Sequence, residues 1–250
     1  MSTTEVVFNS HPFLFAIITR ETIQMYAQAI HKLVMDIACK LAQGMGLASF
    51  SFEGWPCKFR INKYNFSPKT VNSSGVQIHT DSGFLTILQE DENVGGLEVM
   101  DKSGTFVAVE PLPGTLLVNL GDTAKVWSNG RLCNVKHRVV CKEPRTRMSI
   151  ASFLLGPKEA KVEAPAELVD SSHPRLYVPF FYLDYRNLRI SKELQAGEAL
   201  DFSSSKKMNE SRSTEGLSVA GMSNLSMTSD SVLRCTSMCT RAAEYSFHKG

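Results

Sequence analysis

The sequence of 250 residues predicts a mainly β fold with flanking helices, and three observations support this prediction. Short strand-like runs separated by turn residues occupy the segment from Cys57 to Leu155. Apolar residues at helical spacing come before that segment, and a shorter helix-like stretch follows it. Short strands with regular turns between them are typical of two facing antiparallel sheets, the double-sheet jelly roll.

The first predicted element is a long amphipathic helix from Glu21 to about Leu47. Gly44 and Gly46 close it, because glycine is common just after a helix ends. Its apolar residues recur every three or four positions: Ile23, Tyr26, Ile30, Leu33, Ile37 and Leu41. We expect this helix to cover the outside of a sheet.

Nine strand-like runs follow the helix. Turn signals separate them, as at Asn72-Ser73-Ser74-Gly75, Gly95-Gly96 and Asn129-Gly130. The predicted strands are residues 57–64, 76–81, 84–89, 95–101, 105–110, 115–121, 124–128, 132–140 and 148–155. An aromatic cluster then precedes the last helix-like stretch, and its rings serve either as packing or as a substrate wall.

The predicted organisation has three parts. Residues 1–55 form an N-terminal helical segment, and residues 56–202 form the jelly-roll domain with its C-terminal helix. Residues 203–250 hold 12 serines among 48 positions and show no sustained apolar period. Such a segment buries too little apolar surface to order itself, so we expect a disordered tail.

A candidate metal site stands in the run VQIHTD and in the later run NVKHRV. On a strand, His79 and Asp81 leave the same face, and His137 can complete a facial set of three ligands. Two imidazoles and one carboxylate suit Fe(II) and leave coordination positions open for an oxo acid and dioxygen.

A candidate carboxylate clamp follows on another strand-like run. Arg147 and Ser149 lie two residues apart and share one strand face. A guanidinium beside a hydroxyl is the pairing expected to hold the spare carboxylate of a dicarboxylic oxo acid.

These motifs together resemble the plant 2-oxoglutarate and Fe(II)-dependent dioxygenases. The matching elements occur in the family's order and near its spacing: Asn62-Lys63-Tyr64, His79-Thr80-Asp81, His137 and Arg147-Met148-Ser149. Residues 52–66, 79–101 and 128–139 look most like the subfamily of dioxygenases for auxin oxidation. The resemblance covers roughly Glu21 to Phe202.

The resemblance implies a fold, a cofactor and a reaction. The fold is the double-stranded β-helix, a cupin-like jelly roll, with metal ligands His79, Asp81 and His137 in the barrel mouth. The cosubstrate is 2-oxoglutarate, whose far carboxylate Tyr64, Arg147 and Ser149 would hold, and ascorbate would support activity. Family members also begin with about a further hundred residues, so a truncated and inactive chain stays an alternative.

The substrate implied by the subfamily is indole-3-acetic acid, oxidised to 2-oxindole-3-acetic acid. Arg60 shares a strand face with Asn62 and Tyr64, where a cation would suit an acidic substrate. Phe153 and Phe181 are candidates for an apolar substrate wall. A structural role for Arg60 is equally open, as is another acid such as a gibberellin or a flavonoid precursor.

Composition limits the remaining partners and the compartment. With 27 basic and 25 acidic residues and no basic cluster, nothing favours nucleic acid or an anionic membrane as a partner. The six cysteines form no Cys-x-x-Cys pair, and the apolar run of residues 13–18 is too short to span a bilayer. We therefore expect free thiols and a cytoplasmic enzyme.

A binding module with a vestigial metal site remains the alternative from another class of function, although three metal ligands together with a carboxylate clamp favour catalysis.

Overall fold

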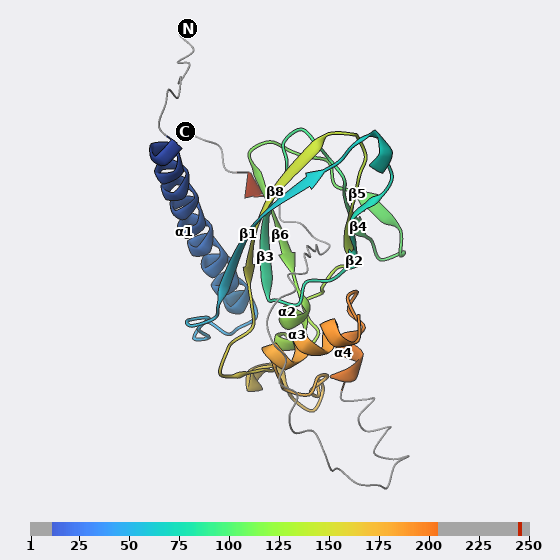
Figure 1. Cartoon of the computed structure of the whole chain (residues 1–250). Coiled ribbons are helices and arrows are strands. Elements are labelled where there is room, and N and C mark those ends of the chain that lie inside the picture. The colour runs from blue at the N-terminus through green and yellow to red at the C-terminus, as the bar shows by residue number, and fades with distance from the viewer. Residues whose placement is uncertain (1–11, 205–244, 247–250) are drawn as a thin grey trace.

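The computed structural model describes residues 12–204 and 245–246, with side chains for residues 20–204. Two antiparallel sheets face each other (Figure 1). The first has the order β1 (Cys57–Asn65), β8 (Thr146–Leu154), β3 (Leu85–Gln89), β6 (Thr115–Leu120) and β11 (Tyr245–Ser246). The second has the order β2 (Ser74–His79), β7 (His137–Val140), β4 (Leu97–Met100) and β5 (Phe106–Ala108). The mainly β, jelly-roll fold predicted from the sequence is confirmed.

Strands β1 and β8 pair over their whole length and carry much of the site. Their register places Lys58 opposite Phe153, Arg60 opposite Ala151, Asn62 opposite Ser149 and Tyr64 opposite Arg147. Side chains alternate along a strand, so these four pairs share one face. Tyr64, Ala151 and Phe153 belong to the buried cluster between the two sheets, so this face is the interior of the barrel.

Helix α1 (Pro12–Gly44) packs on the outside of the first sheet, against β3 and β8 (Figure 1). The helix ends at Gly44, the first of the two predicted closing glycines and about three residues before the predicted end near Leu47, and begins nine residues before the predicted start at Glu21. Its most buried residues form a row four positions apart: Ile30, Val34, Ala38 and Ala42. Apart from Ile30, the predicted apolar residues lie beside this row and not in it. Alanine in the row lets the helix backbone approach the sheet closely, and larger side chains pack on either side of the contact. Ile23, near the N-terminal end of that stripe, is exposed.

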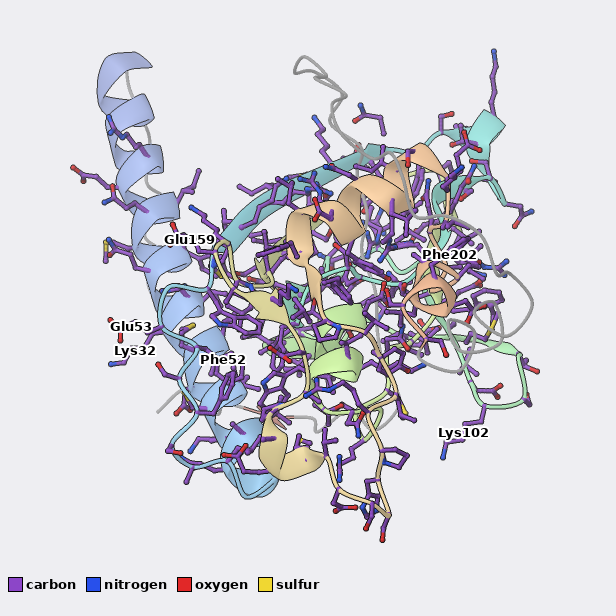
Figure 2. All side chains as sticks on the ribbon, turned by 90° about the horizontal axis from the view of Figure 1, so that it is seen from below. Lys32, Phe52, Glu53, Lys102, Glu159 and Phe202 are labelled. Carbon is purple, nitrogen blue, oxygen red and sulfur yellow. The ribbon has the colours of Figure 1, made fainter. Side chains whose placement is uncertain are left out.

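A second core lies between α1, the first sheet and the loop that leads into β1. Phe52 contacts Phe84 and Trp127 there, with ring centroids 4.8 and 5.6 Å away. Viewed from below, Phe52 lies among packed side chains, whereas Lys32 on α1 and Lys102 in the β4–β5 turn point outward (Figure 2). Burial of these apolar side chains holds α1 against the first sheet through the hydrophobic effect.

Short helices close one end of the barrel (Figure 1). They are α2 (Asp122–Trp127), α3 (Tyr182–Ser191) and α4 (Ala199–Phe202), with the single turn η2 (Ala166–Leu168) and the hairpin of β9 (Lys161–Val162) and β10 (Phe180–Phe181). The single turn η1 (Pro68–Thr70), between β1 and β2, lies at the opposite end (Figure 1). The predicted strand at residues 124–128 is wrong, because this segment belongs to α2. In a run this short the apolar spacing fits either period, and Gly121 followed by Asp122 starts a helix instead.

Other boundaries differ from the sequence predictions. Strand β7 begins only at His137, so residues 132–136 of the predicted strand form a loop. The predicted disordered tail falls almost wholly outside the described residues. Of its described part, Ser203 is half-buried and its carbonyl accepts a hydrogen bond from Val178 N at 2.7 Å, and Tyr245–Ser246 form β11. Among the described cysteines, Cys39, Cys57 and Cys141 are free thiols. None of the described helices is long and apolar enough to cross a membrane.

Candidate active site

Two of the predicted metal ligands face each other across neighbouring strands. His79 ends β2, His137 begins β7, and the two residues are direct partners in the ladder. Their ring centroids are 3.9 Å apart, and both side chains are fully buried. The Nε2 atoms of both rings lack a hydrogen-bond partner among the described residues, whereas His79 Nδ1 lies 2.6 Å from the carbonyl of Gln77.

The electrostatics of this pair suit metal ligation. Burial lowers the pKa of His79 to about 3 and holds the pKa of His137 well below its ordinary value. Both rings are therefore neutral at physiological pH, the state in which imidazole binds a metal ion. Buried nitrogen atoms without a hydrogen-bond partner are costly unless a metal or another donor satisfies them.

The third predicted ligand, Asp81, follows His79 closely in the chain, but its carboxylate is hydrogen-bonded to another side chain. Asp81 lies just past the end of β2, so the turn and not strand alternation decides where its side chain points. Its carboxylate accepts a hydrogen bond from the hydroxyl of Thr86. Within residues 12–204 and 245–246, no three His, Cys, Asp or Glu side chains are arranged as a metal cluster. The donor types of His79, His137 and Asp81 fit Fe(II), and one oxygen of the Asp81 carboxylate is bound to Thr86.

The turn that carries Asp81 is held by the start of α2. Asp122 N donates to Asp81 O at 2.7 Å, and Thr123 N donates to Gly83 O at 3.1 Å. A Cβ atom on Gly121 would lie 2.2 Å from Gly83 O, so only glycine allows this close approach. These contacts fix the backbone of the Asp81 turn even though its carboxylate can rotate.

A buried ion pair that the sequence did not reveal supports the same turn. Asp122 accepts hydrogen bonds from Thr80 Oγ1 at 3.1 Å, from Tyr185 OH at 2.7 Å and from Arg189. Arg189 also donates to the carbonyls of Thr80 at 2.7 Å and of Gln195 at 2.6 Å. Thr80 lies between His79 and Asp81, so helix α3 and helix α2 together position the segment with two predicted ligands.

The predicted carboxylate clamp assembles as expected from the register. Arg147 and Ser149 point inward from β8, opposite Tyr64 and Asn62 of β1. The guanidinium carbon of Arg147 lies 5.0 Å from the centroid of the Tyr64 ring, and Asn62 Nδ2 donates to Ser149 Oγ at 3.3 Å. Glu90, which sequence patterns did not indicate, forms a buried ion pair with Arg147.

A cavity of about 270 Å³ opens beside the Asp81 turn. Its apolar wall includes Phe153, Leu155 and Tyr182, and its cations come from two elements. Lys58 and Arg60 belong to β1, whereas Arg186 and Arg189 belong to α3. The predicted substrate residues Arg60 and Phe153 therefore lie in one cavity, with the Arg60 guanidinium carbon 5.7 Å from the Phe153 ring centroid.

The third predicted substrate residue, Phe181, does not line this cavity. Its side chain is 42% exposed, and Lys161 Nζ lies 5.8 Å from its ring centroid. Phe181 ends β10 and Tyr182 begins α3, and it is Tyr182 that is buried and lines the cavity. Tyr182 OH lies 3.0 Å from Ser82 Oγ, a hydrogen bond that ties α3 to the turn after Asp81.

Comparisons with known proteins agree with this geometry. Residues 55–156 match the model of the 2OG-Fe(II) oxygenase superfamily. The chain is 58% identical over 182 residues to the 2-oxoglutarate-dependent dioxygenase DAO of Oryza sativa subsp. indica, a match that covers 72% of this chain and 61% of the relative. The chain thus spans about three fifths of the length of that relative.

Solved structures show the same similarity in three dimensions. The crystal structure of the dioxygenase for auxin oxidation (DAO) in rice superposes with a TM-score of 0.73 at 54% identity, over 79% of this chain and 66% of that one. The structure of JOX2 in complex with 2OG, Fe and JA superposes with a TM-score of 0.66 at 30% identity, over 74% and 56% of the two chains.

Replacing Asp81 by alanine tests the metal assignment. Asp81→Ala should weaken Mn(II) binding by more than about tenfold, since loss of mere supporting partners already costs about 10–100-fold. Calorimetric titration of the metal-free protein with Mn(II) measures this. Asp184→Ala, on the exposed side of α3, is the matched control and should bind Mn(II) as the unmodified protein does. Equal Mn(II) affinity in both variants would remove Asp81 from the ligand set.

Replacing Arg189 tests the buried ion pair. Arg189→Met should lower the free energy of unfolding by about 3–5 kcal/mol, because it leaves the Asp122 charge buried without its cation. Arg186→Met, one turn earlier on the same helix and exposed, should change it by less than about 0.5 kcal/mol. Urea denaturation followed by circular dichroism measures both. Similar values for the two variants would contradict a special role for Arg189.

Proposed function

Because this chain belongs to the 2OG-Fe(II) oxygenase superfamily, we propose that it is an Fe(II)- and 2-oxoglutarate-dependent dioxygenase acting on a small acidic aromatic substrate. Indole-3-acetic acid, oxidised to 2-oxindole-3-acetic acid, is the substrate favoured by the likeness to the rice dioxygenase for auxin oxidation. The observation that carries this proposal is the cavity beside Asp81, which combines an apolar wall with several cations.

In this proposal His79, His137 and Asp81 hold the iron. Bound Fe(II) supplies the activation of dioxygen that none of the twenty side chains provides. The chain contributes two neutral imidazoles and one carboxylate, and the hydrogen bonds of Asp122 and Arg189 to Thr80 keep the ligand segment in place. Support of this kind matters because ligand orientation tunes metal affinity.

The cosubstrate would lie deeper along the same inner face of β1 and β8. Arg147, Ser149 and Tyr64 come together there, and Arg147 is almost fully buried. A guanidinium in such a site binds a carboxylate strongly and in a defined orientation. The substrate cavity begins at the other end of the same face, with Lys58, Arg60 and Phe153.

The charge of the cavity supports an acidic substrate. Burial and the nearby guanidinium groups of Arg60 and Arg186 lower the pKa of Lys58. Cations that repel one another are relieved by an anion among them. A small aromatic acid would place its carboxylate among these cations and its ring against Phe153 and Leu155.

The same site suits a second kind of substrate. JOX2, whose structure was solved with JA, is 30% identical to this chain, so another hormone-like acid is the alternative within the same chemistry. A chain without activity is the alternative from another class. The 58% identity to the rice dioxygenase, against 30% to JOX2, favours the auxin substrate over both.

Succinate release tests the proposal. Purified protein with Fe(II), ascorbate and 2-oxoglutarate should release more succinate with indole-3-acetate than without it, and 2-oxindole-3-acetate should appear in equal amount. The methyl ester of indole-3-acetate, which lacks the charge, is the matched control and should stimulate little. Stronger stimulation by another acid would assign that acid as the substrate in place of indole-3-acetate. No succinate release with any compound would refute the dioxygenase assignment.

Replacing Arg60 tests the acid-binding role. Arg60→Gln should lower kcat/KM for indole-3-acetate by about tenfold to a hundredfold, as expected for a lost hydrogen bond to a charged group. The slow decarboxylation of 2-oxoglutarate without substrate should stay near the unmodified rate, because the cosubstrate keeps Arg147. Lys63→Gln, exposed on the same strand, is the control. Equal loss of both activities would give Arg60 a structural role.

A further inference from the structure

The guanidinium of Arg147 already has an acidic partner within the protein. The side chains of Arg147 and Glu90 are only 1% and 8% exposed and form an ion pair through Arg147 Nη2 and Glu90 Oε2. Arg147 Nε and Nη1 and Glu90 Oε1 are buried without a hydrogen-bond partner among the described residues. The pair thus uses one edge of the guanidinium and leaves the rest of both groups unsatisfied.

The backbone holds Glu90 in this place. Its neighbour Asp91 accepts from Met148 N at 2.8 Å through Oδ2, and from Asn93 N at 2.9 Å and Val94 N at 3.0 Å through Oδ1. Met148 directly follows Arg147, so Asp91 fastens the end of β3 to β8 beside the guanidinium. Glu90 therefore faces Arg147 because of the fold and not through a flexible surface contact.

This arrangement conflicts with a second carboxylate at the same guanidinium. In the proposed function, the far carboxylate of 2-oxoglutarate also binds Arg147. Two carboxylates this close in a buried site cannot both stay ionised at low cost, so one of them tends to take a proton. The groups that face Glu90 are Arg147 from β8, Asp91 from its own loop, and Tyr64 of β1 across the guanidinium.

We propose that Glu90 competes with the cosubstrate for Arg147, so that binding of 2-oxoglutarate takes up one proton on the Glu90 carboxylate. This inference rests on the proposed function. In the free protein Glu90 pairs with Arg147; in the complex a proton from solvent converts it to a neutral acid. The neutral group can then donate a hydrogen bond to the incoming carboxylate instead of repelling it.

The direction of the pH dependence follows from linkage. Burial raises the pKa of Glu90 above its ordinary value, while the charge of Arg147 acts to lower it. The bound dianion raises this pKa further, because it stabilises the protonated acid. Affinity for 2-oxoglutarate should therefore fall as pH rises from the pKa of Glu90 in the free protein to its pKa in the complex, by up to about tenfold per pH unit.

Calorimetric titration tests this inference. The protein loaded with Mn(II) is titrated with 2-oxoglutarate, without substrate, between about pH 6.5 and 8.5, a range in which the ligand stays a dianion. Glu90→Gln keeps an oxygen for Arg147 and removes the charge. Glu98→Gln is the matched control, since Glu98 is also 8% exposed and pairs with Arg138 and Lys142 in the other sheet.

The expected result separates the variants. The unmodified protein and Glu98→Gln should lose affinity as pH rises, whereas Glu90→Gln should bind about tenfold more tightly at the highest pH and show a flatter profile. A steep profile retained in Glu90→Gln, or weaker binding by it at every pH, would overturn the inference. Binding with no pH dependence in the unmodified protein would do the same.

A second measurement does not depend on the variant. Titration of the unmodified protein in two buffers of different ionisation enthalpy gives the number of protons taken up with the ligand. A value approaching one within the pH window supports the inference, and a value of zero throughout refutes it. No binding of 2-oxoglutarate at any pH would instead refute the proposed function, so the two failures are distinguishable.

Discussion

The buried ion pair of Asp122 and Arg189 is the interaction on which the arrangement of the site depends. It joins the start of α2 to α3, and both residues bind Thr80, which separates His79 from Asp81. Buried charges are tolerated only when they are paired and hydrogen-bonded, so this network has a single satisfied geometry. The helices at the end of the barrel thereby fix the backbone that carries the predicted metal ligands.

The pairing of β1 with β8 arranges the rest of the site as one continuous face. Its register places the cosubstrate group around Arg147 at one end and the substrate group of Lys58, Arg60 and Phe153 at the other. An acidic cosubstrate and an acidic substrate would thus enter along one inner surface with cations at both ends. Glu90 interrupts this pattern, because its carboxylate pairs with Arg147, the cation proposed to bind the cosubstrate.

Local patterns in the sequence were sufficient for most of the fold. Alternating apolar residues and turn signals located eight of the nine predicted strand segments, because each signal lies within the strand that it specifies. The exception, residues 124–128, became α2, since all its apolar side chains are buried and a short run then has no distinctive period. The motif of Arg147 and Ser149 with Tyr64 assembled as predicted, because strand pairing preserves register.

The sequence by itself determined the jelly roll and the family, and it predicted the residues proposed to carry the chemistry. Only the tertiary structure decided how these residues are engaged. It placed Phe181 outside the cavity and Tyr182 inside, turned the Asp81 carboxylate to Thr86, and brought Asp122 to Arg189 and Glu90 to Arg147. The physical reason is the range of the interactions: periodicity and turns act between neighbours in sequence, whereas these ion pairs join residues 57 and 67 positions apart, and only packing brings them together.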